Sequence, residues 1–264
     1  MRGVRVCPGH SSMSTHIRRA VAALLTGLLT AVASVGCAAA DGSSPGSPLV
    51  AVYRGEAACD GCPETIAQRL RASLAHAEVV FIGRDERLPL QADSLADVDL
   101  YVQPEGGDDI GAAAEALPPR FVRGLERYVA SGGRYLGLCM GAYLAGPVAF
   151  GLVETDLDGE VGRPGFAVTD SRSTVVDVAW DGQHRQTFFQ EGAVLPPPDD
   201  RADVFARYGN GDIAASRYDH GDGMAGLIGP HPEADKTWLD EAAITDPDGD
   251  DWKYAVPFVQ TLLD

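Results

Sequence analysis

Short hydrophobic runs alternate with helical patterns in the first half of the sequence. Four of these runs predict β-strands, at residues 49–54, 78–83, 99–103 and 134–139. Hydrophobic residues recur at helical spacing over residues 64–77 and 120–131, and prolines stand at the start of both segments. Strands that alternate with amphipathic helices predict a parallel sheet with helices on both faces. The first half is therefore expected to have an α/β fold.

The second half has a different pattern, with more predicted strands and fewer predicted helices. Short strand-like segments separated by turn residues occur at residues 166–170, 173–180, 187–195, 203–210, 212–219 and 224–229. A helical pattern interrupted by Pro257 closes the chain at residues 252–263. We find no internal repeat and no linker after residue 48. We therefore expect residues 49–264 to form one α/β domain with β-rich additions in its second half.

The first 36 residues differ from the rest of the chain. They contain four arginines, no acidic residue and a hydrophobic stretch of export length, which is typical of a cleaved secretory signal. The sequence SVGC at residues 34–37 resembles the lipobox of bacterial lipoproteins, in which the cysteine is lipidated. We expect a signal peptide at 1–36, lipidation of Cys37 and a flexible tether at 37–48. These features predict an extracytoplasmic protein anchored by lipid to the cell membrane. Secretion without lipid and a retained membrane anchor are the alternatives.

The expected mature chain is strongly acidic. The signal contains four of the 21 basic residues, which leaves 17 against 38 acidic residues and a net charge of −21. Such a chain repels phosphate backbones and anionic lipid surfaces. We therefore expect no nucleic-acid partner and no membrane contact other than the lipid anchor. The sequence predicts no particular oligomeric state.

A cysteine stands at the end of the fourth predicted strand, in the stretch GLCMGAYLAG. Gly137 precedes Cys139 by two residues and Gly141 follows it by two, as a tight turn into a helix requires. Such a turn exposes the sulfur, and the N–H groups that begin the helix lower the thiol pKa and stabilise an oxyanion. Ligands gather at the carboxyl ends of parallel strands, where Gly106 and Gly107 also follow the third predicted strand. The turn predicts a nucleophile, and a buried cysteine without chemical role is the alternative.

A histidine and a glutamate follow the predicted strand at 224–229, in the stretch GPHPEAD. His231 and Glu233 are two residues apart, so on an extended segment their side chains point to the same side. A thiol nucleophile needs a base, and the base needs an acceptor that orients it. Cys139, His231 and Glu233 supply these three roles, whereas an ordinary surface turn is the alternative interpretation of the histidine and glutamate.

Three segments together resemble class I glutamine amidotransferases. The order PEGG, GLCMGAYLA and GLIGPHPEA is similar to that superfamily, and above all to the domain family named after the N-terminal region of biotin–protein ligases. The resemblance extends over roughly residues 48–263. It implies a flavodoxin-like fold and a catalytic triad of Cys139, His231 and Glu233. No ligase or synthetase segment follows, so ligation of biotin and an ammonia tunnel within the chain are not expected.

The same resemblance assigns further groups to the site. It implies an oxyanion hole formed by the backbone N–H of Met140 and that of Gly106 or Gly107, and it puts Glu191 and Tyr143 beside the substrate. We expect a small-molecule or peptide amide as the substrate, no cofactor and no metal ion. The predicted function is that of a cysteine-dependent amide hydrolase or acyl transferase. A binding module that retains the triad without turnover and a cysteine peptidase are the alternatives.

Two weaker motifs favour structural interpretations. Cys59 and Cys62 form a CxxC motif between the first strand and its helix, and a disulfide or two unreactive thiols are favoured over a redox role. A disulfide between them would leave Cys139 as the unpaired cysteine of the domain. The acidic stretch at 246–251 has only a faint similarity to a calcium loop, because the required glycine and glutamate are missing. We expect it to be a surface turn.

Overall fold

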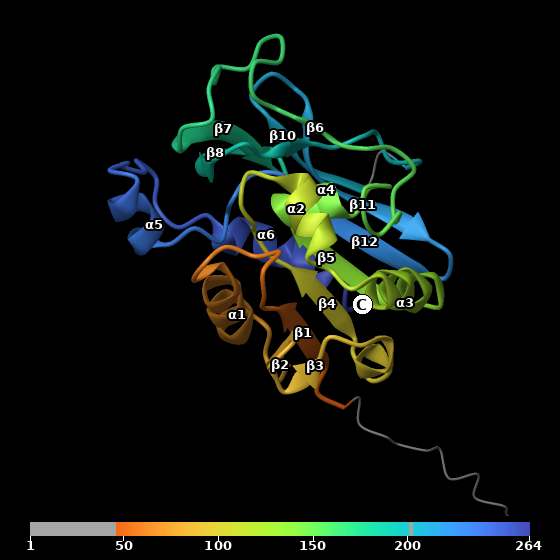
Figure 1. Cartoon of the computed structure of the whole chain (residues 1–264). Coiled ribbons are helices and arrows are strands. Elements are labelled where there is room, and N and C mark those ends of the chain that lie inside the picture. Colours follow the sequence, from red (N-terminus) through yellow and green to blue (C-terminus); the bar gives the residue numbers. More distant parts are fainter. Residues whose placement is uncertain (1–45, 201–202) are drawn as a thin grey trace, which may run out of the picture. The chain divides into compact units, whose positions relative to one another are not determined.

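The computed structural model describes residues 46–200 and 203–264 (Figure 1). The predicted signal peptide, Cys37 and most of the predicted tether lie outside the described residues. No helix in the described part of the chain has both the length and the hydrophobicity needed to cross a membrane.

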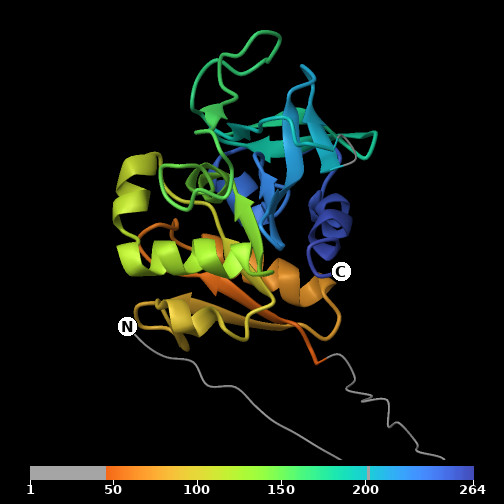
Figure 2. The ribbon, with the colours of Figure 1, turned by 90° about the vertical axis from the view of Figure 1, so that its right-hand side faces the viewer.

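A long sheet runs through the domain (Figures 1 and 2). Its strands are β1 (Leu49–Tyr53), β2 (Glu78–Gly83), β3 (Leu88–Pro89), β4 (Leu100–Gln103), β5 (Arg134–Leu138), β7 (Thr174–Trp180), β8 (Gln183–Phe189), β10 (Val204–Tyr208), β11 (Ile213–His220) and β12 (Gly223–Ile228). Their order is β3-β2-β1-β4-β5-β12-β11-β10-β7-β8. The part from β3 to β12 is parallel, whereas β11, β10, β7 and β8 extend it in antiparallel fashion. The predicted α/β fold with a mostly parallel sheet and β-rich additions is confirmed.

Helices cover both faces of the parallel part, as Figure 2 shows. They are α1 (Cys62–Ser73), α2 (Ile110–Glu115), α3 (Pro119–Ala130), α4 (Met140–Leu144), α5 (Lys236–Glu241) and α6 (Trp252–Gln260), with a 3-10 helix at Ala92–Leu95. Helices α2, α3 and α4 pack into one hydrophobic cluster, and α1 and α6 pack into a second one. Successive residues of β1 enter opposite clusters, because side chains alternate along a strand. The sheet is thus buried on both faces here, which explains the continuous hydrophobic runs.

One predicted strand of the second half is absent. Residues 166–170 form no strand, although the segment is hydrophobic at its start. Phe166 instead packs edge-on against Phe189 and Tyr208, with ring centroids 5.1 and 5.5 Å away. Phe166 is therefore partly buried by an aromatic cluster rather than by strand pairing.

A second predicted strand, at 187–195, is divided in two. β8 ends at Phe189, and β9 (Ala193–Val194) pairs with β6 (Asp158–Gly159) in a separate small sheet. Between them Glu191 adopts a φ of 48°, which ends the extended conformation. A Cβ on Gly192 would lie 2.6 Å from the carbonyl oxygen of Gly229, so the chain passes directly against the segment that follows β12. The turn at 190–192 consequently lies at the carboxyl end of the parallel strands.

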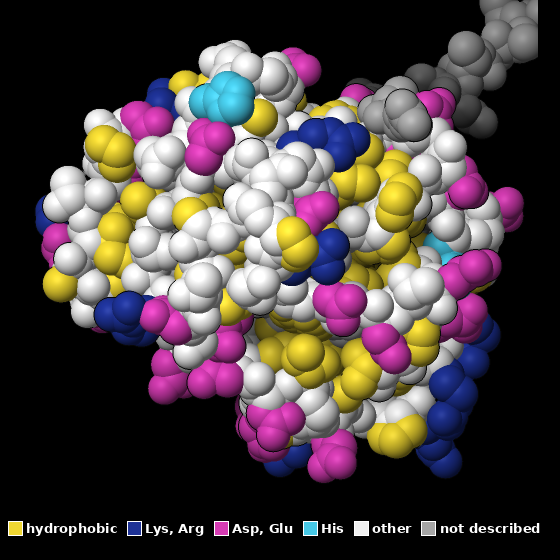
Figure 3. Space-filling view, turned by 90° about the horizontal axis from the view of Figure 1, so that it is seen from above, with side chains coloured by type: hydrophobic (Ala, Val, Ile, Leu, Met, Phe, Trp, Pro, Cys, Tyr) yellow, Lys and Arg dark blue, Asp and Glu magenta, His cyan; other side chains and the backbone are white. Residues whose placement is uncertain are grey.

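The surface of the domain is acidic and offers few exposed hydrophobic groups. Seen from above in Figure 3, Asp and Glu side chains outnumber those of Lys and Arg. Among the described residues, Val148 is the large hydrophobic side chain that is exposed, at 44%. The surface has the charge that the composition predicts.

The sheet order brings three loops to one edge. β4, β5 and β12 are neighbours and run parallel, so their carboxyl ends meet. The loop at 104–109 follows β4, Cys139 follows β5, and the segment at 229–233 follows β12. The edge of the sheet therefore collects the residues that the sequence analysis selected.

Candidate active site

Cys139 occupies a sharp corner between β5 and α4. Its backbone has a φ of 44° and a ψ of −100°, an unusual conformation for a residue other than glycine. The two flanking glycines allow the corner to form, because a Cβ on Gly137 would overlap the backbone of Gly141, and a Cβ on Gly141 would overlap the carbonyl of Gln103 in β4. The spacing of glycines around the cysteine thus has a direct steric cause.

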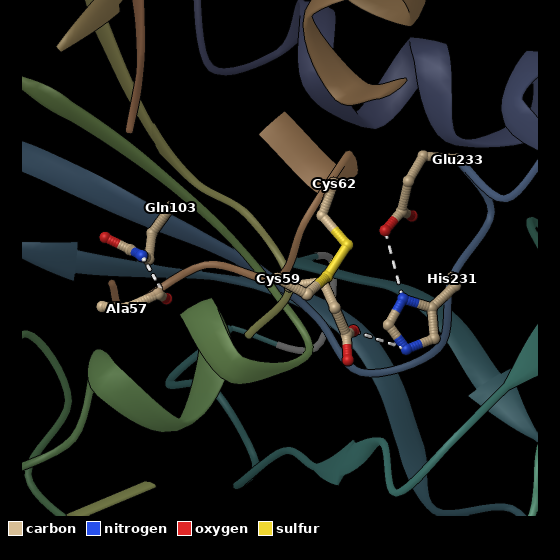
Figure 4. Close-up of a disulfide and its surroundings, with 7 residues drawn as sticks. Ala57, Cys59, Cys62, Gln103, His231 and Glu233 are labelled. Atoms are coloured by element: carbon tan, nitrogen blue, oxygen red, sulfur yellow. Dashed lines mark hydrogen bonds and ion pairs between the residues drawn. A yellow bond between two sulfur atoms is a disulfide. The ribbon is translucent and has the colours of Figure 1, made fainter. Parts of the chain in front are cut away.

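His231 is held rigidly by its neighbours. Its backbone N–H donates to the carbonyl of Phe188 at 2.8 Å, and Nδ1 lies 3.1 Å from Oε1 of Glu233 (Figure 4). Both side chains are buried. The Arg69 guanidinium donates to the carbonyls of Glu233 and Ala234, at 3.0 Å each, and so fixes the loop. The carboxylate can therefore orient the imidazole with Nε2 directed away from it.

A residue that the sequence analysis did not select, Glu105, faces the other nitrogen of this imidazole. Its Oε2 lies 2.8 Å from Nε2 of His231. Although they are close, both atoms are buried and neither makes a geometrically acceptable hydrogen bond with any described residue. A carboxylate oxygen of Glu105, Sγ of Cys139 and a ring nitrogen of His231 all lie within 4.8 Å of one another. The cysteine and the histidine thus share one small space with a second carboxylate.

The pKa of the Cys139 thiol moves in the opposite direction from the one the sequence analysis expected. Burial, reinforced by the charge of Glu105, raises it to about 12. The helix that begins after the cysteine has only five residues, and Sγ is 3.6 Å from the carbonyl of Gln190 rather than exposed. The lowered pKa predicted for the corner is therefore wrong for this conformation, because desolvation outweighs the short helix.

The two groups beside the thiol are also shifted. Burial raises the pKa of Glu105 to about 7, against the opposing effect of His231. Burial alone would lower the pKa of His231, but the neighbouring Glu105 and Cys139 charges outweigh it and raise the pKa above its usual range. In this conformation the imidazole favours the charged form, paired with carboxylates on both sides.

The predicted oxyanion groups lie beside the sulfur. A Cβ on Gly106 would lie 2.6 Å from Cγ of Met140, so the backbone of Gly106 packs closely against the Met140 side chain. Within the described ranges, no hydrogen bond uses the backbone N–H of Gly106, Gly107 or Met140. These donors are available to a ligand, as an oxyanion hole requires.

A turn from the antiparallel part of the sheet covers the cysteine. Sγ is 3.6 Å from the carbonyl of Gln190, and the Tyr143 hydroxyl donates to the carbonyl of Glu191 at 2.8 Å. These residues enclose a cavity of about 100 Å³ next to the thiol. Tyr143 and Glu191 are thus near the cysteine, and their observed contact is with each other.

A larger cavity of about 420 Å³ adjoins the small one. Both are lined by Glu105, Gly107, Asp108 and Gln190. The disulfide between Cys59 and Cys62 also lines the larger cavity, which Trp238 closes on another side. An entering molecule would therefore meet carboxylates before it reached the thiol.

The disulfide supports the Glu105 loop (Figure 4). Cys59 donates its N–H to the carbonyl of Glu105 at 3.0 Å, and Gln103 donates from its side chain to the carbonyl of Ala57 at 3.3 Å. Cys139 is the free cysteine of the described residues. The CxxC motif therefore braces the site and leaves one thiol for chemistry.

The acidic stretch at 246–251 lies apart from this site. Asp248 and Asp251 pair with the Arg185 guanidinium, at 3.5 and 2.9 Å. The three carboxylates of Asp246, Asp248 and Asp251 form a cluster, but an arginine already compensates their charge. The stretch has a structural role between α6 and β8.

The chain is similar to one protein family over part of its length and to several solved structures. Residues 49–172 match the family described as "Biotin-protein ligase, N terminal". A solved structure of a glutamine amidotransferase is similar at 16% identity and a TM-score of 0.51, over 74% of this chain and 98% of that one. A cytoplasmic protein from Salmonella typhimurium is similar at 13% identity and a TM-score of 0.47, over 80% of this chain and 98% of that one. No protein of curated function matches the sequence.

Proposed function

Because residues 49–172 match the biotin–protein ligase N-terminal family, and the fold is that of glutamine amidotransferases, we propose that the chain is an exported cysteine-dependent amide hydrolase or acyl transferase. The observation that carries the proposal is the convergence of Cys139 and His231 within 4.8 Å, together with the 3.1 Å contact from His231 to Glu233. These are the positions that nucleophile, base and orienting acid need.

In the proposed reaction, His231 in its neutral form accepts the thiol proton at Nε2 while Sγ bonds to the carbonyl carbon of an amide. The carbonyl oxygen becomes an oxyanion, to which the N–H groups of Met140 and of Gly106 or Gly107 donate. The C–N bond then breaks, His231 returns the proton to the leaving amine, and a thioester remains. Water or an amine attacks the thioester with His231 again as base, which releases the acyl product and restores the thiol.

Glu105 must change its position or its charge during this cycle. Its carboxylate occupies the Nε2 side of the imidazole, where the thiol proton has to go. A pKa of about 7 makes the neutral carboxylic acid accessible near neutral pH. We propose that substrate entry displaces Glu105 and the turn at 190–192, so that Cys139 and His231 meet.

The charge around the entrance favours a particular class of amide. Glu105 and Asp108 line both cavities, and Glu191 lies over the inner one. Burial raises the pKa of Glu191 as well, and the charge of Asp108 adds to the shift. Substrates with a free amino group, such as amides of amino acids or peptide ends, would compensate this charge better than acidic ones.

The experiment that tests the proposal is covalent trapping. Amino-acid and peptide amides are incubated with the protein, and intact mass is measured after acid quenching. We expect an acyl adduct on Cys139 that is absent in Cys139→Ala, and we expect His231→Ala to lower kcat/KM between about a hundredfold and ten-thousandfold. His220→Ala is the matched control, because His220 pairs with Glu126 at the opposite edge of the sheet.

A second candidate is a binding module that retains the triad without turnover. The raised pKa of Cys139 and the carboxylate at Nε2 favour it. Ligands that raise the melting temperature equally in the wild type and in Cys139→Ala, with no adduct and no product, would support this candidate. The same result would contradict the proposal that the protein is an amide hydrolase or acyl transferase. Cleavage of internal peptide bonds in the same screen would identify a peptidase.

We also propose export and lipidation at Cys37, for which the sequence SVGC at 34–37 is the support. Expression in a bacterium with an alkyne-labelled fatty acid tests this. The wild type should be labelled and sediment with membranes, and Cys37→Ser should lose both properties. Unchanged labelling of Cys37→Ser would contradict lipidation at this residue.

A further inference from the structure

The environment of the thiol contains donors of three different kinds. Glu105 provides a carboxylate oxygen, Cys139 a sulfur and His231 a ring nitrogen, all within 4.8 Å of one another. We propose that these three residues bind a transition metal ion such as zinc, and that the bound ion suppresses the reactivity of the Cys139 thiol. The proposal does not depend on turnover of an amide.

Two buried polar atoms that make no hydrogen bond are the first argument. Oε2 of Glu105 and Nε2 of His231 are buried, lie 2.8 Å apart and make no acceptable hydrogen bond to any described residue. A buried polar atom that makes no hydrogen bond lowers the stability of the fold. The two atoms therefore need either a well-aligned hydrogen bond or a cation that both of them bind. The His231 side chain is fully buried, and that of Glu105 is 14% exposed. A metal ion would satisfy both atoms at once.

The remaining contact of the histidine is the second argument. Nδ1 lies 3.1 Å from Glu233, which is the arrangement that a metal-binding histidine usually has with an outer carboxylate. This contact keeps a proton on Nδ1, so loss of the second proton of the imidazole would leave the Nε2 lone pair directed towards Glu105 and Cys139. The residue that orients a base in the proposed reaction would orient a ligand in the metal-bound form.

The donor types indicate which metal fits. A thiolate and an imidazole favour zinc and related transition metals, whereas magnesium and calcium prefer oxygen alone. Donor atoms on one tetrahedral zinc are roughly 3.3–3.6 Å apart, given bond lengths of about 2.0–2.3 Å. Small side-chain rotations would reach this spacing from the observed one. Three protein ligands leave a fourth position for water, as in sites that exchange ligands.

Charge balance also favours a divalent ion. Metal binding requires the thiolate and the neutral imidazole, so the Cys139 proton and the Nε2 proton of His231 are released to solvent, and Glu105 binds as the carboxylate. Two anionic ligands neutralise a divalent cation inside a site from which water is mostly excluded. Coordination draws electron density from the sulfur and obstructs its approach to a carbonyl, so metal binding should slow the alkylation of Cys139.

The test is a zinc titration of the chelator-treated protein in competition with a chromophoric chelator. We expect one ion per chain, and a loss of more than about tenfold in affinity for Cys139→Ser, His231→Ala and Glu105→Gln. The matched control is Asp248→Asn, which alters the other carboxylate cluster and should leave the affinity unchanged. Magnesium and calcium should not compete.

Two further readouts keep the result independent of folding and of activity. Cobalt should give a thiolate charge-transfer band in the wild type that is missing in Cys139→Ser, and zinc should protect Cys139 from iodoacetamide. Melting curves of each variant show whether it is folded. Binding that survives Cys139→Ser and His231→Ala, or that is lost in Asp248→Asn, overturns the proposal. Zinc binding without any acyl adduct would support the metal site and contradict the proposed amide chemistry. An acyl adduct without zinc binding would support the amide chemistry and contradict the metal site.

Discussion

The parallel and antiparallel parts of the sheet contribute different things to the site. The parallel part delivers Cys139 and the segment carrying His231 from neighbouring strand ends, with the corner determined by close backbone contacts. The antiparallel part delivers the turn at 190–192 that covers the sulfur, and Phe188, whose carbonyl accepts from His231. One part therefore positions the reacting groups, and the other determines how much water and substrate they meet.

The largest effect on stability is expected at Gly141, where the backbone of the parallel part leaves no room for a Cβ. Gly141→Ala should lower the free energy of unfolding by about 3 kcal/mol, because its Cβ would overlap the carbonyl of Gln103. Urea unfolding measures the change. Gly107→Ala is the control, since a Cβ there meets nothing within 4 Å. Equal stabilities of the two variants would contradict the steric account of the corner.

The next effect concerns the carboxylate between the two parts. The pKa of Glu105 is raised from 4.5 to about 7 in the folded protein, so the folded state binds the proton more tightly than the unfolded state does. The resulting contribution to the free energy of unfolding is complete below pH 4.5. This contribution is lost as the pH rises through 7. Relative to Glu105→Gln, the wild type should lose on the order of 2 kcal/mol between pH 4.5 and 8. Urea unfolding in chelating buffer at several pH values measures this.

The comparison with Glu105→Gln is needed because other buried carboxylates shift in the same direction. Burial raises the pKa of Glu160 to about 7 and that of Asp251 to about 6, and both titrate in either protein. Their contributions cancel in the difference. A stability difference that does not vary with pH would show that Glu105 titrates normally.

A somewhat smaller effect is expected on the reactivity of the thiol. Glu105→Gln removes a negative charge that raises the pKa of Cys139, so its thiolate should form at lower pH. A shift of about one pKa unit would raise the rate of alkylation by iodoacetamide about tenfold at a given pH. Glu191→Gln is the control. An unchanged pH profile would mean that burial alone raises the pKa of the Cys139 thiol.

The smallest effect is expected in the antiparallel part. Tyr143→Phe removes the hydroxyl that donates to Glu191 at 2.8 Å, which should cost about 1 kcal/mol of stability. Hydrogen exchange should become faster in the turn at 190–192 and stay unchanged in β4. Equal exchange in both proteins would show that the turn is held by other contacts.

The sequence predicted the strands of the parallel part, and for physical reasons. Continuous hydrophobic runs marked β1, β2, β4 and β5, because strands buried on both faces need no alternation. Cys139 and His231 each follow a predicted strand, and the carboxyl ends of parallel strands lie together, so the two residues were expected to be close. In the second half, the segment at 187–195 was predicted as one strand, whereas it turns at 190–192, because the chain passes against Gly229 there.

Residue types and their order along the chain were sufficient to predict the α/β fold, the strand-to-helix corner and the pairing of a histidine with a glutamate two positions later. They did not reveal that Glu105 lies against the same imidazole, or that the thiol pKa is raised instead of lowered. Both depend on long-range packing: Glu105 points into the site from a loop braced by a disulfide, and the cysteine loses water to a turn some fifty residues away. Desolvation and the approach of charges are set by such contacts, and only the folded chain decides them.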